Sequence, residues 1–435
     1  MALLNRPNPG RSRDKTCMPS CNSGSATVRI IRSAEELEEI RDVWKSWNRH
    51  PNADIDFYKL ICRVRAEILG PYVLVVQRDG RPDCILIGRL EKTRLDVRVG
   101  YLKAFRPQTR VLVFVHGGFL GNTNEENSSL LVSKIIESLN EHKIDAAHFH
   151  QLGLHSPLYD SVKQIPGVMF RDHFSPVEVH RHLKLPRTFD EYFANLPRKQ
   201  RHEVRRHTRM LEHEFSDRVR TQYYGAGANI DELVREAEKV ANKTYQRKLR
   251  VGFKDGVEMR GILDFAACRG ELHACILYVD AEPRAFVIGT LYQNSLHCLS
   301  IGYDPEFGRF SVGLLLVMQW IEEAFRRNQN AEITGIDFGS GDARYKSEIC
   351  NSEWTESSLY VFAPTAKGLA LNLVRTASVV CQGFARDLLQ RLHLLEETKR
   401  AWRRLGAEPT KGAKAIPRIS GLSPEYVRNE RAIHN

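Results

Sequence analysis

Short apolar runs alternate with amphipathic helical segments along most of the chain. An apolar-rich run at residues 296–301 leads into a turn, and an apolar helix at residues 314–325 follows at once. A second run and a glycine-rich hairpin follow at residues 333–346. Strands that alternate with helices of this length predict an α/β fold built on a mixed central sheet flanked by helices.

This pattern of strands and helices occurs twice in the chain. A hairpin-like segment at residues 79–90 recurs at residues 280–291, an offset of 280 − 79 = 201. Aligning Leu130 with Leu315 in the later helices gives 315 − 130 = 185, so the first copy holds 201 − 185 = 16 extra residues, which we place within residues 92–109. Each copy opens on a helix-capping signal, at Ser33 and at Asn229. The repeated order β-α-α-β-β-β-α-β predicts a duplicated α/β unit.

The length of 435 residues favours two domains rather than one core. The helices near the carboxyl end are basic and amphipathic, and either packing on the second domain or contact with an anionic membrane surface fits them. From composition and pattern we expect a disordered leader at 1–26, a first α/β domain at 27–185, a basic linking helix at 186–215, a second α/β domain at 216–363, amphipathic helices at 364–406 and a disordered tail at 407–435.

Composition narrows the class of protein. The net charge of +11 indicates an anionic partner such as a polyphosphate cofactor, nucleic acid or an acidic membrane surface. The nine cysteines are scattered and do not form a metal-binding spacing, so we expect reduced thiols and no metal ion. No apolar run reaches the roughly 18 to 20 residues of a membrane span. These features predict a cytoplasmic protein.

The two copies differ where the helix after the fourth strand of the repeat begins. The second copy has Arg309, Ser311 and Gly313 there, and the free N–H groups of a helix start suit a pyrophosphate. The first copy has Asn124, Glu126 and Ser128 at the aligned positions, and a second acidic residue, Glu125, lies next to Glu126. Acidic residues repel a pyrophosphate, so we expect the second copy to bind a nucleotide-like cofactor. The alternative interpretation is that this segment is an ordinary capped helix start.

Three segments together resemble the tandem branch of the GNAT superfamily of acetyltransferases, in particular CelD/BcsL-like proteins with a BioF-type acyltransferase domain. They are GYDPEFGRFSVGLLL at residues 302–316, IDFGSGDARYK at 336–346 and the basic stretch LPRKQRHEVRRHTRMLE at 196–212. The chain is also similar, more distantly, to Fem-type enzymes that transfer amino acids from tRNA. One departure is that the usual phosphate loop has two glycines around the helix start, whereas this segment has one.

The resemblance implies two tandem GNAT-like domains, with acetyl-CoA or another acyl-CoA bound in the second. It also implies direct acyl transfer to an amine or hydroxyl, often in polysaccharide or cell-envelope biosynthesis. Backbone groups of the strand at 296–301 would hold the pantetheine arm, and the helix start would hold the phosphates. The cofactor-binding residues expected on this basis are Leu299, Ser300, Ile301, Arg309, Ser311, Val312 and Gly313.

For catalysis we select four residues that follow the next strand. Asp337 or Asp342 would act as a base or orient a hydroxyl, Tyr345 would protonate the leaving sulfur, and Lys346 would hold an anionic substrate or the cofactor phosphates. Each also has a purely structural reading, as a turn, packing or solvated residue. His297 and Cys298 are neighbours in a strand and point to opposite faces, so they do not form a nucleophilic pair.

For the acceptor, Tyr303 and Asp304 close the cofactor strand, and Arg205 and Arg206 lie on the basic linking helix. A charge run is usually a solvated face; an anionic acceptor, cofactor phosphates and nucleic acid are the alternatives. No aromatic residues interleave with these arginines, so nucleic acid is disfavoured. The leading prediction is a CoA-dependent N- or O-acyltransferase acting on a saccharide or envelope precursor. A Fem-like aminoacyl-tRNA-dependent transferase and a non-catalytic binding protein are the alternatives.

Overall fold

The structure is a computed structural model that describes residues 26–94, 97–99, 102–105, 107–141, 143–244, 247, 252–327, 333–341 and 343–391. The disorder predicted for the leader and the tail therefore falls almost wholly outside the described residues. The same is true of the predicted catalytic residue Asp342 and of the last part of the carboxyl-terminal helical region.

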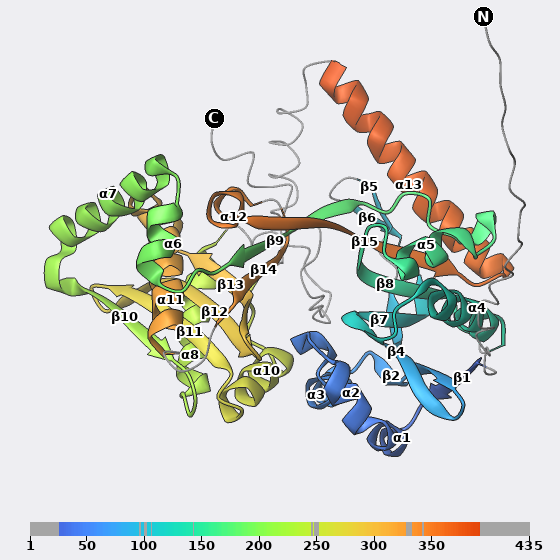
Figure 1. Cartoon of the computed structure of the whole chain (residues 1–435). Helices are drawn as coiled ribbons and strands as arrows, with labels where there is room; N and C mark the ends of the chain where they lie inside the picture. The colour runs from blue at the N-terminus through green and yellow to red at the C-terminus, as the bar shows by residue number, and fades with distance from the viewer. Residues whose placement is uncertain are drawn as a thin grey trace, which may run out of the picture.

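The two halves of the chain fold into α/β units with the same element order, which confirms the predicted duplication. Figure 1 shows them as two lobes, the first half in blue to teal and the second in green to orange. The first half contains β1 (Ala26–Ile31), α1 (Ala34–Glu39), α2 (Arg41–Trp47), η1 (Pro51–Ala53), α3 (Ile55–Val64), β2 (Ile68–Pro71), β3 (Val73–Arg78), β4 (Arg81–Arg94), β5 (Val97–Val99), β6 (Leu102–Phe105), β7 (Gln108–Gly121), α4 (Glu125–Glu141), β8 (Ala146–Gly153), α5 (Pro157–Gln164), η2 (Val168–Phe170) and β9 (Val177–Lys184).

The second half repeats this order after two helices that connect the units. It contains α6 (Phe189–Asn195), α7 (Arg198–Phe215), η3 (Ser216–Arg218), β10 (Val219–Tyr224), α8 (Ile230–Lys243), α10 (Val257–Cys268), β11 (Leu272–Val279), β12 (Glu282–Tyr292), β13 (Ser295–Tyr303), η4 (Pro305–Phe310), α11 (Val312–Arg327), β14 (Gly335–Ser340), α12 (Arg344–Ile349), β15 (Ser352–Phe362) and α13 (Ala366–Arg391). The extra residues of the first copy include the hairpin β5–β6, inside the predicted interval.

Matching local signals produce the matching elements. The β3–β4 turn has positive φ at Asp79 and Gly80, and the β11–β12 turn has positive φ at Asp280 and Ala281, as two-residue hairpins require. Ser33 forms a complete capping box at the start of α1, and the Asn229 side chain accepts the backbone N–H of Glu232 at the start of α8. One difference from the prediction is that the glycine-rich segment after β14 leads into helix α12 and not into a hairpin.

Each half buries both faces of its sheet. In β11, Cys275 and Leu277 belong to the core under α11, whereas Ala274 and Ile276 belong to the core under α8 and α10. This period of two, apolar on both faces, is typical of a strand covered by helices on both sides. The first half has the corresponding pair of cores.

The two halves exchange their last strands. The sheet order is β1-β3-β4-β7-β8-β15-β9-β14-β13-β12-β11-β10, with β2 beside β4. Strand β9, which ends the first half, pairs with β14 of the second half, and β15 of the second half pairs with β8 of the first. The two exchanged strands pair with each other at the centre, where Trp354 lies opposite His180. The two halves therefore meet along β9 and β15, which run between the two lobes in Figure 1.

None of the helices in the described part of the chain has the length and apolar content needed to span a membrane. Helix α13 contacts β15 and η2 of the sheet-bearing body, and Asn372 donates hydrogen bonds to the carbonyls of Met169 and Arg171. The described part of this helix thus packs on the protein itself, and mainly on elements of the first half rather than on the second domain named in the prediction.

Candidate functional site

The strand predicted to hold the pantetheine arm lies beside an opening in the sheet. Strands β13 and β14 are parallel and pair at only three positions, the last of which joins His297 to Asp337. Beyond this point β13 continues to Tyr303 along β12, whereas β14 follows β9. A bulge in the β12–β13 ladder lies between Ile288 and Gly289, opposite Leu299. The predicted residues Leu299, Ser300 and Ile301 lie on the segment of β13 beyond the last pair.

The predicted phosphate site lies at the start of α11. Ser311 immediately precedes the helix with φ 50° and ψ 39°, a left-handed conformation that glycine adopts most easily. It therefore stands where a second glycine would be expected. A Cβ on Gly313 would lie 3.0 Å from the ring of Tyr303, so this glycine permits close packing of the helix start on β13. Val312 is fully buried.

Arg309 is the exposed cation of this helix start. Its side chain is 64% exposed and forms an ion pair with Glu214 of α7. This surface pair is weak because water screens it, so the guanidinium can exchange Glu214 for a phosphate at low cost. The residues present therefore fit the polyphosphate end of a nucleotide cofactor.

The start of α4 in the first half is closed by its own side chains. Asn127 is fully buried, and its amide donates to Asp83. Arg78 pairs with both Asp83 and Glu126. Ser128 is also fully buried, and its hydroxyl donates to the carbonyl of Asn124. Carboxylates and internal hydrogen bonds occupy the place where the second half offers an exposed arginine, which makes this start unsuited to an anion.

The predicted catalytic residues differ in how they are placed. Asp337 lies inside the site, at the last pair of the β13–β14 ladder. Lys346 is 2% exposed, and its ammonium donates to the carbonyls of Phe338 and Ser340, so it stabilises the turn from β14 into α12. Tyr345 packs half-buried with its ring edge against Phe338. The catalytic roles of Tyr345 and Lys346 stay predictions.

The predicted acceptor residues do not gather at one place. Tyr303 is 43% exposed beside Gly313, but Asp304 is fully buried and accepts hydrogen bonds from Lys243 and Arg284. Burial raises the pKa of Asp304, but these two cations outweigh it, and the pKa is lowered. Its carboxylate caps η4 and is paired with two cations, so its observed contacts are structural, and the substrate-binding role stays a prediction. Arg205 and Arg206 are exposed on α7 and do not line the cavity described next.

A cavity between the two halves contains residues that sequence reasoning missed. It lies at the mouth of the β13–β14 opening and receives His50 from the segment before η1, His116 from β7, His180 from β9 and His297 from β13, with Asp337. Gly117 allows His50 to approach, since a Cβ there would lie 2.6 Å from His50. Tyr292 and Asp54, joined by a hydrogen bond, line the same cavity. Both halves therefore build one site.

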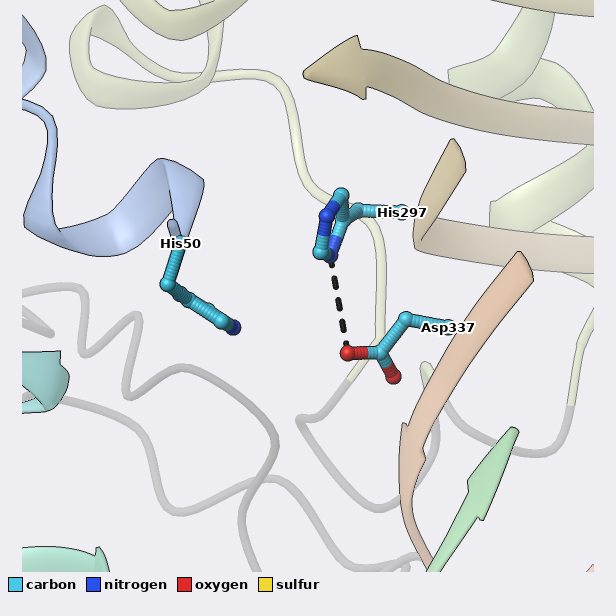
Figure 2. Close-up of side chains that lie close together, drawn as sticks. All are labelled: His50, His297 and Asp337. Carbon is cyan, nitrogen blue, oxygen red and sulfur yellow. Dashed lines mark ion pairs between the residues drawn. The ribbon is translucent and has the colours of Figure 1, made fainter. Parts of the chain in front are cut away.

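The imidazoles and carboxylates form a connected chain. Asp337 Oδ2 lies 3.5 Å from His297 Nδ1, and Asp337 Oδ1 lies 2.6 Å from His180 Nε2. The other nitrogen of His180 lies 3.1 Å from Glu356, whose second oxygen is 3.6 Å from His116 Nε2. Figure 2 shows the His297–Asp337 end of this network of side chains, with His297 facing Asp337 and the ring of His50 directed toward both. Buried His297 Nε2 has no hydrogen-bond partner among the described residues.

The protonation states follow from these contacts. Burial lowers the pKa of His180, but hydrogen bonds and charge from Asp337 and Glu356 outweigh it and raise the pKa to about 9. Burial raises the pKa values of both carboxyls, yet their histidine partners outweigh it: the pKa of Asp337 falls well below its usual range and that of Glu356 falls to about 2. Burial and the neighbouring His116 and His297 hold the pKa of His50 well below its usual value. A charged His180 thus lies between two carboxylates, and His50 is neutral.

Among the residues that the structure describes, two sets of side chains have the composition of metal sites: His50, His297 and Asp337, and His116, His180 and Glu356. His50 Nδ1 accepts the backbone N–H of Asn52, so a neutral ring carries its proton on Nε2 and has no lone pair there for a metal. Both nitrogens of His180 face carboxylates. The arrangement fits proton transfer better than metal binding, and the expected absence of a metal ion stays a prediction.

The comparisons with known proteins add a family likeness for the second half. Residues 198–347 match the family described as Acetyltransferase (GNAT) domain. This range contains α7, α11, His297 and Asp337, so the prediction of a GNAT-type domain is confirmed for this part of the chain. The matched range does not distinguish a CelD/BcsL-like protein from other members. No curated protein matches the chain.

Solved structures with a similar course of the chain share little sequence with it. FemX has 11% identity and a TM-score of 0.49, with 77% of this chain and 97% of that one covered. A tandem GNAT protein from the clavulanic acid biosynthesis pathway has 13% identity and a TM-score of 0.48, with coverage of 78% and 100%. The C-terminal domain of a putative lysylphosphatidylglycerol synthetase from Agrobacterium fabrum has 13% identity and a TM-score of 0.44, with coverage of 78% and 95%. No residue role follows from these likenesses.

Proposed function

We propose that the protein is an acyl-CoA-dependent N- or O-acyltransferase that transfers an acyl group directly to an amine or hydroxyl of a saccharide or cell-envelope precursor. The observation that carries the proposal is the position of the His297–Asp337 pair. It lies at the last rung before β13 and β14 separate, on the same strand that leads to the basic start of α11. An acid–base pair and an anion site are thus connected by one open strand.

The donor is held by the second half. The N–H groups at the start of α11 and the guanidinium of Arg309 bind the phosphates, and the open edge of β13 at residues 299–301 binds the pantetheine arm by main-chain hydrogen bonds. The thioester supplies the activated acyl group. Helix start and open strand are both present before binding, so little ordering is needed.

The acceptor is activated by His297. Asp337 Oδ2 accepts from Nδ1–H, which leaves the lone pair on Nε2 to take the proton of the attacking amine or hydroxyl. The long separation of 3.5 Å is compatible with this role, because catalytic hydrogen bonds often tighten only when substrate binds. Asp337, with its lowered pKa, orients and stabilises the imidazolium and is not itself the base. The neutral His50 presents Nε2–H as a fixed donor toward the same space.

Three measurements test this function. Acetyl-CoA should raise the melting temperature, and a panel of amines and saccharides should release free thiol from it. Arg309→Glu should abolish the shift in melting temperature, whereas the matched control Arg235→Glu, which reverses an arginine 60% exposed on α8, should keep it. Thiol release that needs acceptor and is lost in His297→Ala supports the proposal. Absence of any shift with acyl-CoA, or equal loss in both arginine variants, contradicts it.

A Fem-like transferase remains the second candidate because α7 exposes Arg205 and Arg206 on one basic helix. It predicts a gel shift with bulk tRNA that weakens steeply with salt and disappears when both arginines become Glu. Failure of tRNA to bind at low salt removes this candidate. A non-catalytic protein predicts that no acceptor releases thiol.

A further inference from the structure

The first half retains an opening that corresponds to the donor opening of the second. Parallel strands β7 and β8 pair from Val111 and Ala146 to Phe114 and Phe149, and β7 then continues to Gly121 along β4. A groove of about 280 Å³ lies beyond the last pair. This volume is just below the ~300–1,000 Å³ of pockets for drug-sized ligands, so the groove suits one ring-sized group.

The charge of the groove differs from that of the donor site. Within the described part of the chain, neither lysine nor arginine lines it. Glu356, the carboxylate among its described lining residues, already faces His180 and His116. Burial, with smaller effects of neighbouring cations, lowers the pKa of His150 to about 3, so this lining imidazole is neutral. The adjacent helix start carries Glu126 where the donor side has Ser311, and a phosphate or carboxylate is therefore disfavoured on two counts.

The walls combine a flat aromatic surface with neutral polar edges. Trp354 is 41% exposed; one face of its indole stacks on His180 at 4.2 Å between ring centroids, and its N–H donates to Glu356. Phe119 and Leu152 add apolar surface to the lining of the same groove. Polar lining comes from Gln151, His150 and Ser156.

The groove opens toward the reacting groups. His116 and Gln151 line both this groove and the cavity that contains His297. The ring centroid of His50 lies 4.6 Å from that of His116 and 5.3 Å from that of His297. A molecule seated on Trp354 can therefore extend a hydroxyl or amine past His116 toward His297 Nε2.

We infer that the first-half groove is the acceptor subsite and that it takes an uncharged, hydroxyl-bearing ring, an unphosphorylated sugar unit rather than a sugar phosphate. The inference rests on the proposed function, because it assigns the acceptor of that same reaction. The two halves then sort donor from acceptor by charge: the second half binds the polyanionic donor and the first half binds the neutral acceptor.

A hydrocarbon chain is the main competing occupant, since several lining residues are apolar. It would cover the polar edge of the His150 imidazole with apolar surface, which is unfavourable because that edge gains no hydrogen bond in exchange. A sugar ring meets the indole with its C–H face and this edge with its hydroxyls, so the lining is matched on both counts.

The experiment uses the full chain labelled with 5-fluorotryptophan. The chain has five tryptophans, and each gives a separate fluorine NMR signal. Trp354→Phe identifies the signal of Trp354. Methyl β-glucoside is expected to shift that signal in the millimolar range, whereas glucose 6-phosphate and decanoate at equal concentration are expected to leave it in place. A shift with decanoate alone, an equal shift with the phosphate, or no shift with the neutral sugar overturns the inference.

Two glycine variants separate this outcome from failure of the donor site. A Cβ at Gly153, which lines the groove, or at Gly70, which does not, would meet no atom within 4 Å. Gly153→Leu is expected to weaken sugar binding at least about tenfold, a loss of 1.4 kcal/mol, while Gly70→Leu leaves it unchanged. Acetyl-CoA binding by calorimetry should survive in both. Loss of sugar binding in both variants contradicts the inference, whereas absence of acetyl-CoA binding in the unmodified protein contradicts the proposed function.

Discussion

The two halves have the same strand order, but the equivalent rungs of their parallel ladders carry different chemistry. Gly88 pairs with Phe114, and its counterpart Gly289 pairs with Cys298. The preceding rungs are therefore Val113–His148 in the first half and His297–Asp337 in the second. His148 stacks on Tyr360 as part of the packing, whereas His297 faces a carboxylate and a cavity. The two α/β units share one backbone arrangement, and a few side chains determine which unit is suited to catalysis.

The largest expected effect comes from the rung itself. His297→Ala should lower kcat by about 10²–10⁴-fold, the range for loss of a general base, with the KM for acyl-CoA little changed. The matched substitution His148→Ala should change kcat by less than about threefold after correction for folded fraction, because that ring has no reacting partner. Thiol release at saturating acceptor measures both. Equal losses in the two halves would show that the rung does not separate them.

The helix starts offer the next largest contrast. Arg309→Glu should weaken acyl-CoA binding roughly tenfold or more, since it places a carboxylate at the phosphate site. Glu126→Arg in the first half should not create a second binding site, because Arg78 and Asp83 still occupy that helix start. Calorimetric titration measures affinity and stoichiometry together. Two sites per chain in Glu126→Arg would mean that charge alone distinguishes the halves.

The pH dependence of stability tests the charged contact of His180 with Asp337 and Glu356, where the two halves meet. The pKa of His180 is about 9 in the folded protein and ~6.5 when unfolded, so its contribution is complete below pH ~6.5 and is lost as pH rises to 9. The loss is on the order of 3 kcal/mol in the free energy of unfolding. Urea titrations from pH 6 to 9 should show this slope, and His180→Gln should flatten it.

His182→Gln is the control for that experiment. Burial lowers the pKa of His182, so its titration affects stability only below its unfolded pKa. The slope between pH 6.5 and 9 should stay unchanged in this variant. A slope that persists in His180→Gln would mean that His180 is not the charged link between Asp337 and Glu356.

The smallest effect is expected on the basic helix α7. Arg205 and Arg206 are exposed and do not line the cavity between the halves, so changing both to Glu should alter acyl transfer by less than about twofold. Steady-state rates with acetyl-CoA test this. A much larger loss would return these residues to the substrate-binding role predicted from the sequence.

Local patterns in the sequence were sufficient to predict the two α/β units and the order of their elements. The repeated hairpin, the caps at Ser33 and Asn229 and the difference between the helix starts are short-range signals, and each fixes a nearby element. The predicted hairpin after β14 was wrong, because helix α12 forms there instead. Lys346 stabilises this helix by donating to the carbonyls of Phe338 and Ser340, which take their positions only when β14 has folded. The strand exchange could not be predicted, since the pairing of β9 with β14 depends on partners far apart in the chain.

The site was only partly predictable for the same reason. Asp337 was selected because it follows a strand, but its role depends on His180, 157 positions earlier in the chain. His297 was considered only with its neighbour Cys298, as a nucleophilic pair that the alternating faces of a strand disfavour. Its partners come from another strand and another half. Sixteen histidines, four of them meeting at one cavity, were the available signal, but sequence spacing does not bring them together.

Calorimetric titration of the full chain with desulfo-CoA tests the central claim most directly, because this ligand carries the phosphates and pantetheine but cannot react. We expect one site per chain, located in the second half, that is lost in Gly313→Glu. Two sites per chain, no binding at all, or undiminished binding in Gly313→Glu would contradict it.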